Sequence, residues 1–442
     1  MYTSFIGKKF LSAWNTKVGK GLTARQFFDE IMFPSFFDGE RHLMHVHGSA
    51  FFQKIAEKDL ATGKSESEIR RENLHKSVAT KYPSGSTFVG YAAEGTTGTT
   101  SGQVTGISVK IDHEEIYASW IGEALAMGVS GGFYMISERE ELLLSVFEGW
   151  KIYRKFLDQT PNLKGRQIET WNGQWIAYRL DGGDPEEFYP SFEEKTDVKT
   201  KAKYWAINTL EWTKLVFSLS KKLPGEVLTV YAYNLSQTNT TLGFLNLNLP
   251  EVNRLFQFRD KVFLNKGESM LTYQEIEALE PLFNFKRAAA FGAIGLRALE
   301  PDKLRDYLPQ RDPKKNKGLN LTKAEAHKQF QIFKLWIYAM LNRTELLELA
   351  GQIAQILLQF EDAGKERGKK VNDQLSEEVQ GATSLRVFVD KLGEVLALFP
   401  AASETFRKTV DNAVKMPGDQ LPLFVALIRF EYNYQKYQPK SD

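Results

Sequence analysis

The chain of 442 residues contains no cysteine. This absence excludes disulfide bonds, iron–sulfur clusters and cysteine-based zinc sites, and it fits a reducing cytoplasm. The sequence also lacks an uninterrupted apolar run of the roughly 18–20 residues that a membrane helix needs. Its first residues lack the apolar stretch of a signal peptide. We therefore expect a soluble cytoplasmic protein with no membrane partner.

An excess of one charge is also missing, because 57 lysine and arginine residues face 55 aspartate and glutamate residues, for a net charge of +2. A hydrophobic share of 42% and a charged share of 25% are ordinary for a globular protein. The aromatic share of 13% suits large cores or base-stacking surfaces, and cores are the better expectation. At this length we expect two or three domains.

The sharpest change along the chain is the segment Pro309–Asn320, which holds two prolines, one glycine and four cations. Strand and turn signals dominate before it, and every long apolar pattern after it indicates helix. We expect an α+β N-terminal body with mixed or antiparallel strands, followed by an all-α helical bundle. The predicted regions are a mixed region at 1–115, an α+β middle at 116–310 and a bundle at 323–442.

Several short patterns predict elements in the body. Thr23–Phe28 is typical of a helix start, and Ser137 with Glu140 forms a capping box before a helix that extends to Phe156. The Asn172-Gly173 pair predicts a type I′ hairpin between strands at 166–171 and 174–180. Alternating residues also predict strands at 87–91 and 104–111, and a strand pair at 227–234 and 242–249.

Apolar residues at spacings of three and four predict five helices in the bundle. Their stripes lie at 330–341, 346–360, 385–399, 406–414 and 423–428. Pro400, Pro417 and Gly418 require short connections, which favour an antiparallel bundle.

Two catalytic patterns are present in part. Gly128-Val129-Ser130-Gly131-Gly132 matches the nucleophile elbow, but 117–127 indicates a helix where the elbow needs a strand. Of the six histidines only His327 follows Ser130, so a glycine-rich turn after a helix is the preferred interpretation. Thr62-Gly63-Lys64-Ser65 resembles a phosphate loop, but Lys58 stands where the pattern requires glycine.

Histidines gather at His42, His45 and His47, with Glu40 nearby. Such ligands can hold zinc or manganese, so a metal-dependent enzyme centred on them is one alternative function. The others are that these histidines are hydrogen-bonded structural residues or contact phosphate. Stoichiometric metal in the purified protein would support the enzyme.

Basic and polar residues gather near predicted loops and helix ends, where they can neutralise phosphates. The candidate DNA-binding residues are Lys8, Lys9, Asn15, Lys17, Lys20, Thr96, Thr97, Thr99, Thr100, Ser101, Gln103, Lys314, Lys315, Lys317, Lys365, Arg367, Lys369 and Lys370. The candidate RNA-binding residues are Arg70, Arg71, Lys76 and Lys81. Each cluster taken alone is most simply a solvated surface.

The layout and one segment resemble a known family, the large subunit of type I CRISPR surveillance (Cascade) complexes, most closely the compact subtype I-B versions. Some of these serve CRISPR-associated transposons. The segment is Gly131-Gly-Phe-Tyr-Met-Ile-Ser-Glu-Arg-Glu-Glu-Leu-Leu-Leu-Ser-Val-Phe-Glu-Gly-Trp-Lys-Ile-Tyr-Arg-Lys-Phe-Leu157. The family has no invariant catalytic motif, and this chain lacks the cysteines of its zinc-binding relatives.

The resemblance implies a non-catalytic subunit of antiviral defence without a cofactor. Its partners would be guide RNA, target double-stranded DNA, the other Cascade backbone subunits and a small subunit translated separately from an internal start such as Met340. The body would recognise the protospacer-adjacent motif (PAM) and help to open the R-loop, while the bundle would guide the displaced strand. The polar loop Glu94–Gln103 is the candidate wedge, and replacing Thr96–Ser101 should blunt PAM discrimination. A scaffold without nucleic acid is the remaining alternative.

Overall fold

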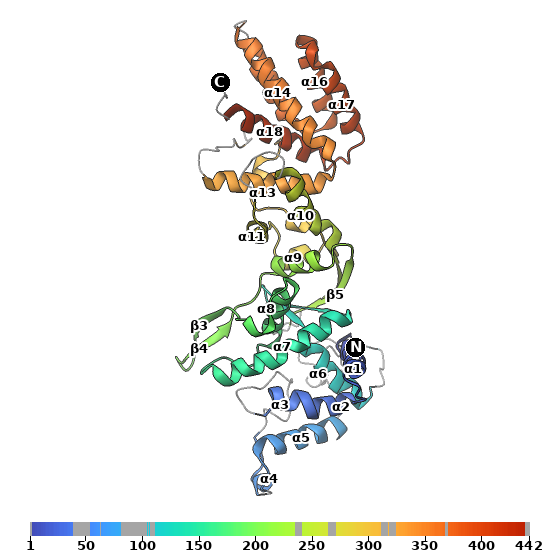
Figure 1. Cartoon of the computed structure of the whole chain (residues 1–442), viewed down its shortest axis with the longest axis vertical. Coiled ribbons are helices and arrows are strands. Elements are labelled where there is room, and N and C mark those ends of the chain that lie inside the picture. The colour runs from blue at the N-terminus through green and yellow to red at the C-terminus, as the bar shows by residue number, and fades with distance from the viewer. Residues whose placement is uncertain are drawn as a thin grey trace. The chain divides into compact units, whose positions relative to one another are not determined.

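The computed structural model describes residues 2–38, 54–61, 63–80, 104, 106, 111–234, 241–263, 271–310, 317, 324–366 and 370–437 (Figure 1). The chain forms two compact units. Unit 1 comprises Met1–Leu249 and Phe285–Ala293, and unit 2 comprises Pro250–Asn284 and Ile294–Asp442. The predicted fold class is confirmed, with a small sheet among the helices of the N-terminal half and a helical C-terminal region.

A five-stranded sheet of order β1-β2-β5-β6-β7 organises unit 1. Its strands are β1 (Met127–Val129), β2 (Phe133–Ser137), β5 (Val227–Tyr233), β6 (Thr241–Asn248) and β7 (Ala293–Ile294), at whose end the chain passes into unit 2. The first four pair antiparallel in succession. The predicted pairing of 227–234 with 242–249 is therefore confirmed. In β5 the even positions from Leu228 to Ala232 are buried, and Val227 and Thr229 are exposed.

The described helices of unit 1 pack around this sheet and around one another. They are α1 (Tyr2–Val18), α2 (Ala24–Phe27), the π-helical turn η1 (Phe28–Met32), α3 (Phe33–Phe36), α4 (Glu57–Leu60), α5 (Glu66–Thr80), α6 (His113–Ala124), α7 (Glu140–Gln159), α8 (Ile168–Leu180), α9 (Trp212–Lys222) and α12 (Phe285–Ala289). A separate hairpin, β3 (Phe192–Thr196) with β4 (Lys203–Ile207), forms a two-stranded sheet.

Helices α1 and α6 approach so closely that their backbones touch. A Cβ at Gly7 would lie 1.9 Å from the carbonyl oxygen of Ala118, and one at Gly122 would lie 1.9 Å from that of Thr3. Only glycine leaves room for such an approach. The contact fixes α1, which carries the N-terminal lysines, against the body.

The predicted hairpin at Asn172-Gly173 is wrong, because these residues lie inside α8. Gly173 packs against the carbonyl oxygen of Gly128, and buried Asn172 donates to the carbonyls of Ala124 and Ala126. Trp171 adds a bond from Nε1 to the carbonyl of Gly149. These tertiary contacts outweigh the local preference of an Asn-Gly pair for a turn.

The other local predictions of the body have mixed outcomes. Thr23 caps α2 in a capping box with Gln26, so the predicted helix start is confirmed. The helix α7 is confirmed, but its predicted capping box is wrong: its N-cap is Arg139, and Ser137 ends β2 and accepts from the backbone N–H of Arg139. The predicted strand at 87–91 lies outside the described residues, as does most of that at 104–111.

Unit 2 contains more helix than the five stripes predict. All five are present, as α13 (Ala324–Leu341), α14 (Thr344–Glu366), α16 (Leu385–Leu398), α17 (Ser403–Val414) and α18 (Leu421–Tyr437). The prediction missed α15 (Val371–Gln380), which packs against α14, α16 and α18. Unit 2 also includes α10 (Leu249–Phe263, from Pro250 onward) and α11 (Tyr273–Glu277).

The break at Pro309–Asn320 does not separate the two units. Residues before it pack on helices after it: Trp336 of α13 donates to the carbonyl of Leu296, and Arg429 of α18 donates to that of Tyr307. The ring of Tyr307 lies 5.6 Å from that of Phe333. The chain first enters unit 2 at Pro250 instead. The predicted border at residues 310–323 therefore falls inside a unit.

Candidate nucleic-acid interface

The four predicted DNA-binding lysines of the N-terminus lie on or just after α1, and each has a carboxylate partner. Lys8 pairs with Glu115, Lys9 with Glu138, Lys17 with Glu148 and Lys20 with Glu30. Exposed pairs of this kind are weak, so the lysines stay accessible, but their partners offset the positive charge that would attract phosphate.

Asn15, predicted beside them, has a structural role. Its side-chain amide donates to the carbonyl of Leu22, and its oxygen accepts from the backbone N–H of the same residue. These two bonds close the turn after α1, which Gly19 enters with a positive φ of 68°.

The predicted RNA-binding residues Arg70, Arg71 and Lys76 lie on α5, which carries Leu74 and Val78 in the core. Arg70 pairs with Glu66 one helical turn earlier, and the guanidinium of Arg71 lies 4.6 Å from the ring centre of Phe33. Lys76 is exposed. The structure thus brings the three onto one helix, where two of them already have partners within the protein.

The basic residues predicted in unit 2 are only partly described. Lys317 bonds Asp306 and lies over the ring of Tyr307, and Lys365 bonds Asp362. Lys370 is exposed and precedes α15.

Many predicted site residues lie outside the described residues. They are Lys81, Thr96, Thr97, Thr99, Thr100, Ser101, Gln103, Lys314, Lys315, Arg367 and Lys369, together with the candidate metal ligands Glu40, His42, His45 and His47. Across the described part of the chain, no group of three or more His, Asp or Glu side chains is arranged to hold a metal ion. In that same part, no helix combines the length and apolarity needed to cross a membrane.

The nucleophile-elbow pattern has a different geometry from the one that the enzyme class requires. Ser130 follows β1 and precedes β2, so a strand rather than a helix comes after it. Gly131 and Gly132 have φ of 87° and 75° and form the tight turn between these strands. The hydroxyl of Ser130 donates to Glu211 at 2.8 Å. A glycine-rich turn was the preferred interpretation, but it joins two strands rather than following a helix.

Asp29, His75 and Tyr117 form a hydrogen-bonded chain of the kind found in active sites, and the sequence analysis did not predict it. His75 lies between Asp29, 2.8 Å from Nε2, and the hydroxyl of Tyr117, 2.6 Å from Nδ1. An ionised aspartate only accepts, so Nε2–H donates to Asp29 and Nδ1 accepts from Tyr117. Burial lowers the pKa of His75 and raises that of Tyr117 to about 12. Tyr117 is buried and is not activated, so the chain of bonds ties α5 to η1 and α6.

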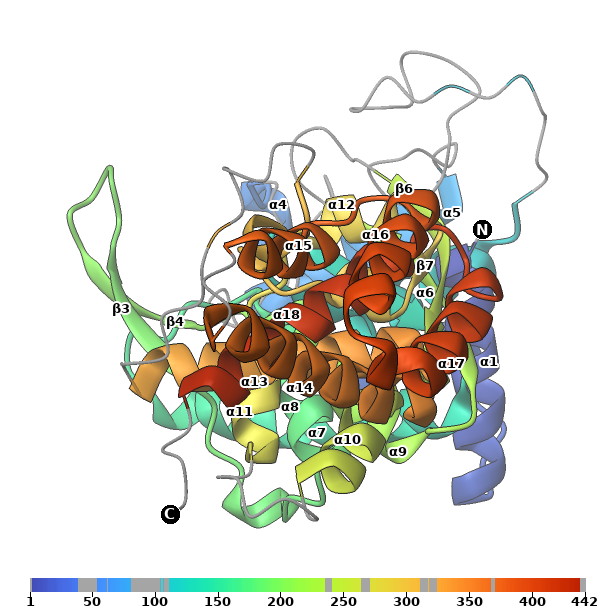
Figure 2. The same cartoon turned by 90° about the horizontal axis from the view of Figure 1, so that it is seen from above.

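An exposed hairpin with basic residues at its turn, β3–β4, was missed by sequence reasoning. It projects beyond the helices of unit 1 in Figure 2. Its turn is closed by Asp197, whose carboxylate accepts from the backbone N–H groups of Lys199 and Thr200. The bond from Thr200 lowers the pKa of Asp197, and Lys201 takes a positive φ of 57°.

Charges on the hairpin divide into a paired stem and a basic tip. In the stem, Lys195 pairs with Glu193 and Lys203 with Glu194. At the tip, Lys199 and Lys201 are exposed beside Val198, whose side chain is 84% exposed. Neither tip lysine forms an ion pair within the described parts of the chain. The available signal was the Asp-Val-Lys-Thr-Lys run, which is typical of a polar turn between two strands.

Comparisons with known proteins give no relative for this chain. No family model, no curated protein and no solved structure matches it.

Proposed function

We propose that this chain is a non-catalytic large subunit of an RNA-guided DNA surveillance complex that contacts duplex DNA at the PAM and helps to open its strands. The observation that supports this best is the projecting β3–β4 hairpin with its basic tip. The family resemblance adds guide RNA and the other backbone subunits as partners, in the cytoplasm.

The hairpin has the shape and charge that a groove contact requires. The major groove of DNA admits a two-stranded β-ribbon, and lysines at its edge can neutralise phosphates without reading sequence. The stem pairs Lys195–Glu193 and Lys203–Glu194 lie on the strands, which leaves Lys199 and Lys201 at the leading end. Such a contact positions the protein on the duplex, while base pairing with the guide reads the sequence.

The test measures duplex binding against salt for the full chain. In the variant Lys199→Ala with Lys201→Ala, two phosphate contacts are lost, so the slope of log affinity against log salt should fall by about 2. The comparison variant is Lys8→Ala with Lys9→Ala, which removes the same charge from two other candidate DNA-binding residues whose carboxylate partners, Glu115 and Glu138, offset part of that charge. We expect a smaller loss there, and equal slopes in all three proteins would exclude the hairpin as the DNA contact.

The proposal that the chain belongs to an RNA-guided complex is tested with protein purified from its native cell. Bound RNA should be guide-like, with a constant 5′ sequence, when the purified material is sequenced. A protein that carries no such RNA but holds stoichiometric metal would instead support the enzyme centred on His42, His45 and His47.

A further inference from the structure

An exposed aromatic surface covers the outward side of β5 and β6 where α1 begins. Tyr2 lies 4.9 Å from the rings of both Tyr231 and Phe244, and it stacks on Phe5 at 6.1 Å. Tyr231 and Phe244 face each other across the strand pair at 5.2 Å. Phe244 is 61% exposed and Phe5 48% exposed. These four residues are the aromatic platform.

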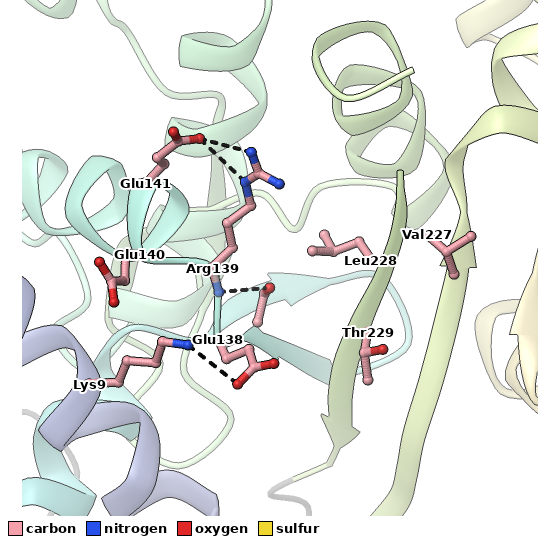
Figure 3. Close-up of a pocket in the computed structure, with 9 residues that line it drawn as sticks. Lys9, Glu138, Arg139, Glu140, Glu141, Val227, Leu228 and Thr229 are labelled. Atoms are coloured by element: carbon pink, nitrogen blue, oxygen red, sulfur yellow. Dashed lines mark hydrogen bonds and ion pairs between the residues drawn. The ribbon is translucent and has the colours of Figure 1, made fainter. Parts of the chain in front are cut away.

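An open cavity of about 490 Å³ lies beside the start of β5 (Figure 3). Its walls are Val227, Leu228 and Thr229 on one side and Lys9 with residues 137–141 on the other. The outward side chains of β5 run from Val227 and Thr229 in the cavity to Tyr231 in the platform. Four residues of strand cover roughly 13 Å, so one extended segment of about five residues would reach from one to the other.

The cavity carries an excess of negative charge. Its walls contain three carboxylates, Glu138, Glu140 and Glu141, against the two cations Lys9 and Arg139. Lys9 already pairs with Glu138, and Arg139 pairs with Glu141 and also with Glu226 beyond the cavity. Burial, followed by the charge of Glu138, raises the pKa of Tyr2 to about 12, which is consistent with the acidic side chain lying near the platform.

The negative charge of the cavity favours one of two kinds of ligand that bind to aromatic rings, nucleic-acid bases and cationic side chains. Bases of single-stranded nucleic acid stack on exposed aromatic side chains, but their phosphates would here face a surplus of carboxylates. Guanidinium and ammonium groups bind both the faces of aromatic rings and carboxylates. The geometry points to this surface as a docking site for an extended, arginine- or lysine-bearing segment of a protein partner.

The inference concerns a different surface from the β3–β4 hairpin and stands without the proposed DNA contact. Phe5 and Phe244 are the exposed members of the platform, whereas Tyr2 and Tyr231 are half-buried, so Phe244 can be changed with little effect on the core. Phe244→Ala removes the ring, and Phe244→Leu keeps an apolar side chain without a π face. Glu140→Gln, in the first turn of α7, removes one carboxylate of the cavity without changing its shape. Tyr437→Ala is the matched control, because Tyr437 is an exposed aromatic residue at the end of α18.

The experiment is isothermal titration calorimetry of the full chain with a blocked hexapeptide of alternating arginine and alanine. The matched glutamate–alanine peptide and a 15-nucleotide oligothymidine are titrated in parallel. We expect binding of the arginine peptide alone, weakened about 2- to 30-fold by both Phe244 variants, which is the range for a cation on an aromatic face. Glu140→Gln should also weaken it, and Tyr437→Ala should not.

Four results would overturn the inference. Full binding by Phe244→Leu would show that an apolar side chain suffices without a π face. Equal binding by all variants, or no binding by the wild type, would show that the peptide does not bind at this surface. Binding of oligothymidine that falls in Phe244→Ala while peptide binding does not would assign the platform to single-stranded nucleic acid. Thermal unfolding of each variant identifies any loss of fold, and Glu140→Gln keeps the test valid if Phe244→Ala unfolds.

Discussion

The buried carboxyl of Glu169 should make the stability of unit 1 fall as the pH rises. Glu169 lies in the first turn of α8, where its backbone contacts Gly128, the strand partner of Tyr134. Burial, followed by the charge of buried Glu123, raises the pKa of Glu169 from 4.5 to about 8. The same surroundings raise the pKa of Tyr233 well above its ordinary value, mainly through burial. No cation is among the causes of the shift, so ionisation of Glu169 is costly.

The sign and size follow from proton linkage. Between pH 4.5 and 8 the folded protein keeps the Glu169 proton, whereas the unfolded chain has lost it, so the free energy of unfolding falls with rising pH. A shift of about 3.5 pH units at about 1.4 kcal/mol per unit corresponds to a cost on the order of 5 kcal/mol once the group is ionised. From pH 5 to pH 8 the expected loss is therefore about 4 kcal/mol.

Urea unfolding at pH 5, 6, 7 and 8 would measure this loss in the wild type, in Glu169→Gln and in the control Glu187→Gln. Glutamine keeps the shape without titrating, so Glu169→Gln should lose the downward slope, and Glu187→Gln, at an exposed position, should retain it. His75 contributes the opposite slope, because its pKa is lowered by folding, but this contribution is common to all three proteins. If the wild type and Glu169→Gln show parallel pH dependences, the assignment of the buried proton to Glu169 is wrong.

Two further predictions concern unit 2. Lys334 and Glu431, 1% and 4% exposed, form a buried ion pair at 2.7 Å. Lys334→Met should lower the free energy of unfolding in urea by about 3–5 kcal/mol, because it leaves Glu431 buried without its cation, and Lys334→Met with Glu431→Leu should recover most of this loss. An equal loss in the single and double variants would contradict the prediction. A fragment that starts at Asn320 lacks the buried contact of Leu296 with α13. When both fragments are heated and followed by circular dichroism, it should unfold less cooperatively than a fragment that starts at Pro250. Equally sharp transitions would show that the helices after Asn320 fold cooperatively without the preceding residues.

The fragment prediction also bears on the internal start proposed at Met340. This residue lies at the end of α13, so translation from it would omit nearly the whole helix, including buried Phe333 and Ile337. An upstream start that keeps the helix would still lack Leu296 and Tyr307, which pack on it or beside it. A small subunit made from this chain would need to replace these contacts.

Patterns within single elements were predicted well. The apolar stripes of α13, α14, α16, α17 and α18 follow directly from residue spacing. The structure adds that α18 is buried on every side from Leu423 to Tyr432, which the stripe alone does not show. The pair β5–β6 and the helix start at Thr23 are equally local. The missed helix α15 has only ten residues and few apolar positions, so its pattern is short, and the hairpin β3–β4 has charged residues where an alternating apolar pattern would be expected.

The errors come from interactions between segments far apart in the chain. Asn172-Gly173 has the composition of a turn, but Gly173 meets the backbone of Gly128, and Asn172 bonds α6. The N-terminal lysines have the composition of a phosphate-binding cluster, but carboxylates from α6, α7 and η1 and from the end of β2 lie beside them. In both cases the partner residues lie far away in the sequence, so the local pattern does not reveal them.

The sequence by itself determined the helical character of the C-terminal half, the β5–β6 pairing and the classes excluded by the missing cysteines, since these depend on composition and on periodicity within one element. Only the tertiary structure decided where the units divide and which charges and rings remain accessible. The basic break near Pro309 does not divide the units, because Leu296 and Tyr307 before it pack on α13. Arg429 of α18 also donates to the carbonyls of Tyr307 before the break and Lys317 within it. The tip of β3–β4 and the aromatic platform stand out for the same reason, since exposure is a property of everything that packs nearby.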